Sequence, residues 1–178
     1  MQNADSGHFP RRLVTGHDPS GRSVVISDEP VPPGWVERDA GVSFFEIWNT
    51  PAVPAKIGAH ERMPSPAAAG RIGPPPDGTL IRINEFAPGH VRDGLQSPIH
   101  RTETIDYGIV LAGEIVLLLD DSEVTLRTGD VVVQRGTDHA WANRTDTVAR
   151  MAFILIAGHF DEELAGMIAP PATGDDAG

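Results

Sequence analysis

The chain reads GLQSPIHRTETIDYGIVLAG over residues 94–113 and GDVVVQRGTDHAWAN over residues 129–143. Both stretches combine short aliphatic or β-branched segments with glycines at their ends, and turn-forming residues stand at 112–113 and 128–129. Apolar segments of about four to eight residues that are bounded by such turns are typical of β-strands. The two stretches therefore predict a set of strands that follow one another closely.

The same pattern extends in both directions along the chain. We expect strands over residues 79–87, 104–111, 114–119, 123–126, 130–134, 139–143 and 149–156. Short strands at dense, even spacing are the signature of an antiparallel barrel or jelly roll. We therefore predict an all-β fold, namely a double-stranded β-helix or jelly-roll barrel over residues 79–158.

The segments outside this barrel differ from it in composition. Residues 1–50 predict an N-terminal arm of strands that packs on the barrel. Within it, residues 11–15 and 23–27 form a hairpin around a turn, and a further strand follows at residues 42–48. Residues 51–78 are rich in proline, alanine and glycine and predict a long loop that runs over the surface or covers an opening.

The C-terminal residues 159–178 predict a short helix, at residues 161–168, followed by an acidic tail that frays. We find no internal repeat and no second domain in the sequence. One compact domain with an arm and a tail is the expectation for 178 residues.

Composition excludes several classes of partner. The chain has 25 acidic and 14 basic residues, for a formal net charge of -11. Such a surface would repel phosphate backbones and anionic lipid, so we expect neither a nucleic-acid nor a membrane partner. The first ten residues resemble no signal peptide, which favours a cytoplasmic protein. Because the chain has no cysteine, any metal ion must be held by histidine, aspartate, glutamate or asparagine.

Side chains that could carry chemistry share faces of the predicted strands. If residues 100–106 are extended, alternation places His100, Thr102 and Asp106 on one face. On a later strand, His139 begins a second same-face set with Trp141 and Asn143. If both strands line one barrel, His100, Asp106 and His139 can meet.

These residues carry a resemblance to a known family. Residues 94–113 look like the first motif of the cupin superfamily, G-x5-H-x-H-x3-E-x6-G, with all spacings matched. Residues 129–143 are similar to the second motif, G-x5-P-x-G-x2-H-x3-N, although they run one residue short and Arg135 stands where the family has proline. The resemblance implies the RmlC-like jelly-roll barrel of that superfamily.

The resemblance also implies a metal site in the barrel. Its ligands would be His100, Asp106 in place of the family's glutamate, and His139, while Thr102 replaces the family's second histidine. Two histidines and one carboxylate are the composition that holds non-haem iron with open positions for oxygen and substrate. The implied cofactor is a divalent transition metal, Fe, Mn, Ni or Zn. The alternative is a site without an ion, in which the same residues only form hydrogen bonds.

Four further side chains are candidates for substrate chemistry. We expect Thr102 and Asn143 to orient a substrate oxygen or to pass a proton through water. A pocket-facing Arg82 would bind a carboxylate or enolate of the substrate, whereas an exposed position at the rim is the alternative. Trp141 forms either an aromatic wall of the pocket or part of the core.

The resulting hypothesis is a metal-dependent small-molecule enzyme of cupin type. It would act as an oxygenase, isomerase, cyclase or decarboxylase on an apolar or aromatic metabolite that bears oxygen. The alternative is a non-catalytic, metal-free cupin that binds a small molecule. A third reading, a metal-free epimerase acting on a sugar nucleotide, lacks an evident cationic cradle for a diphosphate.

The N-terminal hairpin also bears on how the chain assembles. A sheet edge that the N-terminal hairpin leaves open is liable to pair with another chain, and exchange of the arm between two chains would cover it. We therefore expect a homodimer. Tyr107 lies on the opposite face from Asp106 by alternation, which favours packing in the core or at an interface over catalysis.

Overall fold

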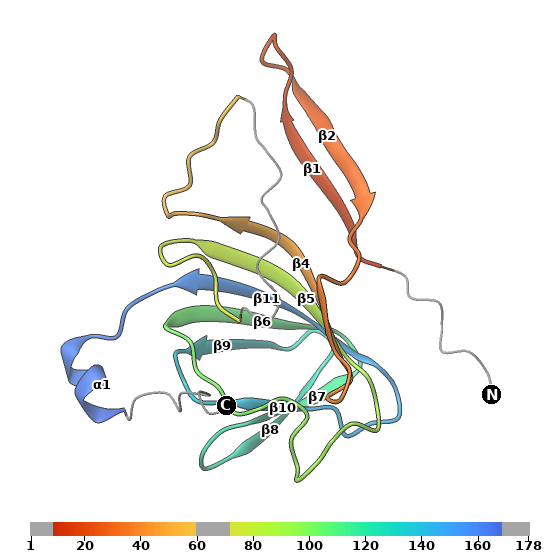
Figure 1. Ribbon diagram of the computed structural model, residues 1–178, viewed down its shortest axis with the longest axis vertical. Coiled ribbons are helices and arrows are strands. Elements are labelled where there is room, and N and C mark those ends of the chain that lie inside the picture. The colour runs from red at the N-terminus through yellow and green to blue at the C-terminus, as the bar shows by residue number, and fades with distance from the viewer. Residues whose placement is uncertain (1–8, 60–71, 169–178) are drawn as a thin grey trace, which may run out of the picture.

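A computed structural model describes residues 9–59 and 72–168 of the chain (Figure 1). Two antiparallel sheets, one of six strands and one of three, face each other, and a separate two-stranded hairpin stands beside them. This arrangement confirms the predicted all-β jelly roll. Among the described residues, no helix is long and apolar enough to cross a membrane.

The six-stranded sheet has the order β3-β4-β5-β11-β6-β9. Its strands are β3 (Trp35–Glu37), β4 (Val42–Thr50), β5 (Thr79–Phe86), β6 (Thr104–Ala112), β9 (Val131–Arg135) and β11 (Ala149–Ala157). The three-stranded sheet has the order β10-β7-β8 and consists of β7 (Glu114–Leu118), β8 (Glu123–Arg127) and β10 (Ala140–Ala142).

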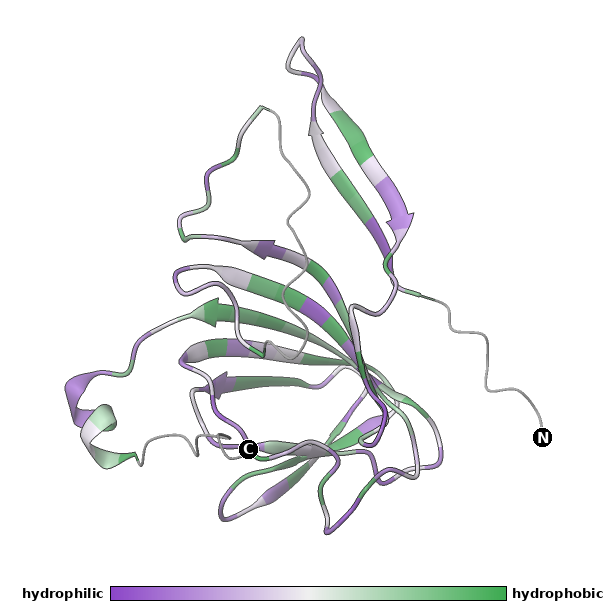
Figure 2. Cartoon of the chain, in the orientation of Figure 1, coloured by the Kyte–Doolittle hydropathy of each residue, from purple (hydrophilic) through white to green (hydrophobic). Residues whose placement is uncertain are grey.

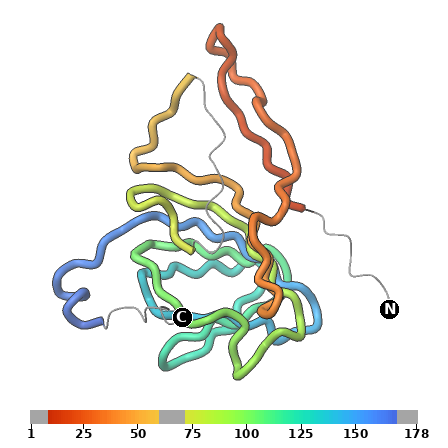
Figure 3. Tube along the Cα trace, viewed as in Figure 1, coloured from red at the N-terminus to blue at the C-terminus, as the bar shows by residue number. Residues whose placement is uncertain are grey.

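The N-terminal hairpin joins β1 (Arg11–His17) to β2 (Ser23–Pro30). Arg11 and Asp28 form an ion pair across it. The hairpin stands off the barrel beyond β4 (Figures 1 and 3). We call β1 and β2 together the arm hairpin. The strand β4, which follows it in the chain, pairs with β5 and so belongs to the six-stranded sheet.

The short helix α1 (Glu162–Met167) follows β11. Asp161 precedes it and accepts a hydrogen bond from the Leu164 backbone N–H at 2.8 Å, which satisfies one of the donors that a helix start leaves free. The expected acidic tail after residue 168 lies outside the described residues, as does the middle of the expected loop, residues 60–71.

Alternation in the strands separates core from surface. In β6, Asp106, Gly108 and Val110 face inward, and the inward residues of β5 include Arg82 and Asn84. Apolar side chains fill one part of the space between the two sheets; they include Phe86, Val110, Ile115, Leu117, Met151, Phe153 and Leu155. The remaining part of that space is a cavity.

Candidate functional site

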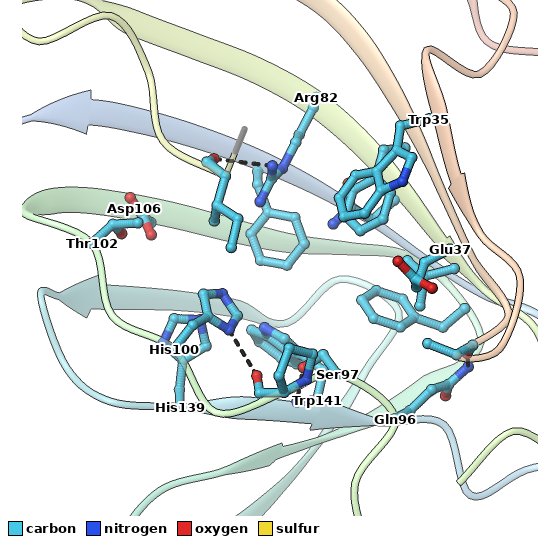
Figure 4. A pocket seen from close by; sticks show the side chains of 18 of the residues that line it. Trp35, Glu37, Arg82, Gln96, Ser97, His100, Thr102, Asp106, His139 and Trp141 are labelled. Atoms are coloured by element: carbon cyan, nitrogen blue, oxygen red, sulfur yellow. Dashed lines mark hydrogen bonds between the residues drawn. The ribbon is translucent and has the colours of Figure 1, made fainter. Parts of the chain in front are cut away.

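The cavity between the two sheets has a volume of about 320 Å³. One set of its lining residues is aromatic or aliphatic and the other is polar, as Figure 4 shows. The apolar lining includes Trp35, Phe44, Ile72, Phe86, Trp141, Phe153 and Leu155. The polar lining includes Arg82, Asn84, Gln96, His100, Thr102, Asp106, Gln134 and His139.

Two histidines lie next to each other on one wall of the cavity. His100 and His139 pair directly across an antiparallel bridge, where each backbone N–H donates to the other's carbonyl at 3.0 and 3.1 Å. This pairing holds the two ring centroids 4.3 Å apart. His100 and His139, which were expected to meet if both segments line one barrel, are thus brought together by an isolated backbone bridge.

The hydrogen bonds of the two rings fix their tautomers. The Nδ1 atom of His100 lies 2.9 Å from the carbonyl oxygen of Pro98, and that of His139 lies 2.9 Å from the carbonyl oxygen of Thr137. Because a carbonyl oxygen only accepts, Nδ1 carries the hydrogen in both rings. Each Nε2 is then left with a lone pair that can accept a hydrogen bond or a proton.

Both imidazoles are neutral at pH 7. Burial lowers the pKa of His139 to about 4, and the neighbouring His100 ring lowers it further, against the hydrogen bond to Thr137. Burial also lowers the pKa of His100, and the charge of Arg82 acts in the same direction. The pair therefore offers two acceptors to a bound molecule.

Arg82 provides a buried positive charge in the same cavity. Burial lowers the pKa of its guanidinium to about 10, against the opposing effects of Asp106 and Glu46, so Arg82 stays protonated at pH 7. Its Nη1 donates to the Ile72 carbonyl at 3.0 Å, and its guanidinium lies 5.4 Å from the centre of the Phe44 ring. The structure thus places Arg82 in the cavity and not at an exposed rim.

Trp141 and Thr102 also line the cavity. The Trp141 ring packs edge-on against His139 and against Phe153, with centroids 6.0 and 5.4 Å apart. It is both a wall of the cavity and part of the core. The Thr102 hydroxyl lies 2.6 Å from that of Thr104, so the two share a hydrogen bond.

Asn143 lies outside the cavity lining, contrary to the expectation that it handles a substrate oxygen. Its side-chain amide donates to the carbonyls of Phe86 and Thr147 at 2.8 and 2.7 Å, and its oxygen accepts from the Thr145 backbone N–H at 3.0 Å. The residue is 1% exposed. All its polar atoms are therefore engaged in holding the loop before β11, and we assign it no chemical role.

Several buried polar atoms in the cavity have no hydrogen-bond partner within the described part of the chain. They are Oδ1 of Asp106, Oδ1 of Asn84, Nε of Arg82 and both Nε2 and Oε1 of Gln134. Buried polar atoms are normally paired, and leaving one unpaired costs about 1 to 3 kcal/mol. These atoms therefore mark the places where a polar ligand, or water, completes the site.

Gln134 and Asn84 are site residues that sequence reasoning missed. Gln134 lies directly opposite Asp106 in the pairing of β6 with β9, and Asn84 follows Arg82 on the inner face of β5. A carboxamide at an inward position of a strand is the signal that could have identified both.

The predicted metal ligands do not form an ion-binding set. The two imidazoles adjoin, but among residues 9–59 and 72–168 no three His, Asp or Glu side chains are placed to hold one ion. Burial raises the pKa of Asp106, against a hydrogen bond from Thr104 and the charge of Arg82. The described residues thus do not fit the facial triad expected from the sequence.

Comparison with known proteins identifies the family. The family model for the cupin domain matches residues 83–156. The chain is 38% identical to Phomopsin biosynthesis cluster protein C' of Diaporthe leptostromiformis, over 87% of this chain and 83% of that protein. It is 35% identical to the cupin-domain-containing oxidoreductase fogC of Aspergillus ruber, over 82% of this chain and 71% of that protein.

Solved structures include a cupin superfamily protein from Desulfitobacterium hafniense, which is 23% identical with a TM-score of 0.38, over 44% of this chain and 66% of that one. The family model and the two sequence relatives together establish that this chain belongs to the cupin superfamily. The resemblance of its two motifs to that superfamily is confirmed.

Proposed function

We propose that this chain is a small-molecule enzyme of cupin type that acts on an apolar or aromatic metabolite bearing oxygen. The observation that carries the proposal is a cavity in which two neutral imidazole acceptors share the lining with a buried guanidinium and an aromatic wall. The names of the relatives support it, because they include cupin-domain-containing oxidoreductases and proteins of biosynthesis clusters.

Binding follows from the lining of the cavity. An aromatic ring would pack against Trp141, Phe153 and Phe44, which removes apolar surface from water. A hydroxyl of the ligand would donate to Nε2 of His100 or His139. A carbonyl oxygen would accept from Arg82, as a charge-assisted hydrogen bond.

The same groups can move a proton. His100 would take a proton from a carbon next to the substrate carbonyl, and the electron pair of the broken C–H bond would pass to the carbonyl oxygen. Arg82 would stabilise the enolate so formed. In a substrate with a C=C bond next to that carbon, the negative charge extends to the γ carbon, and return of the proton from His100 to the γ carbon would complete an isomerisation without any co-reactant. His100 is the better base of the pair because it is less buried than His139.

A second candidate function is binding without catalysis, and the pKa of His139 favours it. A ring whose pKa is about 4 accepts hydrogen bonds at pH 7 but is a weak base. If His100 is also too weak a base, the cavity would hold its ligand without exchanging protons with it.

Four simple aromatic probes distinguish the roles of the polar groups in binding. They are 2-hydroxyacetophenone, by which we mean 1-(2-hydroxyphenyl)ethanone with its hydroxyl on the ring, acetophenone, phenol and ethylbenzene. These carry both oxygen groups, the carbonyl alone, the hydroxyl alone and neither. Isothermal titration at pH 7.5 should give the tightest binding for 2-hydroxyacetophenone. Equal affinity for 2-hydroxyacetophenone and ethylbenzene would contradict the proposed recognition of oxygen.

Proton transfer is tested by hydrogen exchange into D₂O. Loss of the methyl proton signal of 2-hydroxyacetophenone should be faster with the protein, and His100→Gln should slow it by about 100-fold, which is the usual contribution of a general base. His17→Gln, a change of an exposed histidine in the arm hairpin, is the matched control and should leave the rate unchanged. Binding of the probe with no exchange above the buffer rate would reject the enzyme and leave the binding protein.

A further inference from the structure

Gln134 is a buried carboxamide whose amide atoms are both unpaired. It is 3% exposed and lines the cavity, yet neither its Nε2 nor its Oε1 forms a hydrogen bond with the described residues. It lies near the end of β9, which is apolar over residues 131–133 and becomes hydrophilic only at its C-terminal end (Figure 2). Because an unpaired buried amide lowers stability, a partner outside the chain best explains Gln134.

A second glutamine of the same cavity has all its partners within the chain. Nε2 of Gln96 donates to the carbonyls of Ala40 and Ala87, both at 2.8 Å, and its Oε1 accepts from the Asn143 backbone N–H at 2.9 Å. Gln96 therefore holds the backbone around it in place. The amide of Gln134 has no such bonds within the described part of the chain, so it is free to bind a ligand.

Asp106 lies directly opposite Gln134 in the pairing of β6 with β9. Side chains at such positions have Cβ atoms about 4.5 to 5.5 Å apart, so one small group can contact both. Oδ1 of Asp106 is also buried without a partner among the described residues, which means that the two side chains leave each other's atoms unpaired. Figure 4 shows Asp106 at one end of the cavity and Glu37 and Gln96 at the other. We call Gln134 and Asp106 together the polar subsite.

The cavity has more unpaired acceptors than donors. Among the fully buried atoms of its described residues, the unpaired acceptors are Oδ1 of Asp106, Oδ1 of Asn84 and Oε1 of Gln134. The Nε2 atoms of the two imidazoles add to them. The unpaired donors of this buried set are Nε2 of Gln134 and Nε of Arg82. A ligand that matches this lining therefore brings several N–H or O–H donors.

The planar amide of Gln134 selects the kind of group that binds beside it. Its N–H and its C=O lie side by side in one plane, so it pairs best with a group that has an acceptor and a donor in the same arrangement. A primary carboxamide has this arrangement and is neutral at pH 7. A carboxylate has no donor and would place a second negative charge next to Asp106. An ammonium group has no acceptor and would share the cavity with the buried charge of Arg82.

We propose that the substrate of this chain carries a primary carboxamide, which the polar subsite binds. The amide oxygen accepts from Nε2 of Gln134, and the N–H on the same side as that oxygen donates to Oε1 of Gln134. The second N–H donates to Oδ1 of Asp106. This inference rests on the proposed function, because it requires that the substrate occupy this cavity, and it narrows the substrate class to carboxamides.

Two pairs of probes of matched shape test the pairing in the wild type. Benzamide carries NH₂ where acetophenone carries a methyl group. N-methylbenzamide is compared in the same way with propiophenone, and its trans amide places the methyl group on the oxygen side, where the N–H of benzamide would pair with Gln134.

Isothermal titration at pH 7.5 measures both pairs. Benzamide should bind about 10-fold more tightly than acetophenone, or better, because buried acceptors gain donors. N-methylbenzamide should gain only about twofold or less over propiophenone, because its methyl group blocks the pairing. An equal gain in the two pairs would overturn the pairing with Gln134.

A substitution then locates the subsite. Gln134→Met removes the amide at nearly constant size and should reduce the preference for benzamide over acetophenone to about twofold or less. Val133→Met is the matched control, since Val133 precedes Gln134 on β9 but is 54% exposed, and it should keep the wild-type preference. Should Gln134→Met fail to fold, as judged by circular dichroism, Gln134→Leu takes its place. A folded Gln134 variant that keeps the full preference would overturn the assignment.

The outcomes separate this inference from the proposed function. If 2-hydroxyacetophenone binds and benzamide binds no more tightly than acetophenone, the carboxamide is wrong and the proposed function stands. If benzoate binds more tightly than benzamide, Arg82 selects the ligand and the role of the polar subsite is overturned. If none of the aromatic probes binds, the proposed function fails and this inference fails with it.

Discussion

Acidification should destabilise the protein through His139. Its pKa is about 4 in the folded chain and 6.5 in the unfolded chain, so the folded state binds fewer protons between these values. The contribution of His139 to the free energy of unfolding is therefore complete above pH 6.5 and is lost as pH falls toward 4. From the two pKa values, the loss between pH 7.5 and pH 5 is about 2 kcal/mol.

Urea unfolding at pH 7.5 and pH 5, followed by tryptophan fluorescence, measures this loss. The free energy of unfolding of the wild type should fall by about 2 kcal/mol more than that of His139→Gln, because glutamine has no proton to gain. His17→Gln, which changes an exposed histidine, should behave as the wild type does. If the free energy of unfolding falls by the same amount in the wild type and in His139→Gln, the pKa of His139 is not lowered, and the interpretation of His100 and His139 as neutral, buried imidazoles is refuted.

Three further outcomes are expected. Asn143→Ala should lower the free energy of unfolding by about 3 kcal/mol, because buried carbonyls lose their donors, while the affinity of the folded protein for 2-hydroxyacetophenone stays within twofold of the wild type. Gly136→Ala should lower the free energy of unfolding in urea by about 3 kcal/mol, because φ of Gly136 is 62° and a Cβ there would lie 2.4 Å from the Phe160 ring. Gly129→Ala should lower it by only about 1 kcal/mol, because φ is again positive, at 96°, but the space around Gly129 is open. Treatment with EDTA should leave the calorimetric affinity for 2-hydroxyacetophenone unchanged, and a tenfold loss that added metal restores would show that an ion belongs to the site.

The barrel could be predicted from the sequence because its strands are short, apolar and separated by turn residues. The observed strands β5 to β9 and β11 begin and end within one residue of the expected bounds. Strand β3 was missed because three residues after Pro32, Pro33 and Gly34 are too few to show a period. Its Trp35 nevertheless stacks on Phe44 at 4.4 Å and lines the cavity.

The candidate site could be predicted only in part, because alternation gives the face of a side chain but not its distance from another. His100 and Asp106 do line one cavity, yet the chain is not extended between them and bends at Glu103. Strand β10 ends at Ala142, so the alternation of faces that begins at His139 does not extend to Asn143. His139 and Trp141 both line the cavity, as alternation predicted, because the chain is extended between them.

Two-bond ¹H–¹⁵N NMR of the histidine rings at pH 7.5 tests the central claim most directly, since it identifies which ring nitrogen carries the hydrogen. The structure predicts Nδ1–H tautomers for His100 and His139, and addition of 2-hydroxyacetophenone should shift an Nε2 resonance of the pair. His100→Gln and His139→Gln assign the signals. Rings that carry the hydrogen on Nε2, or Nε2 resonances that do not move when the probe is bound, would contradict the assignment of these two imidazoles as the acceptors of the site.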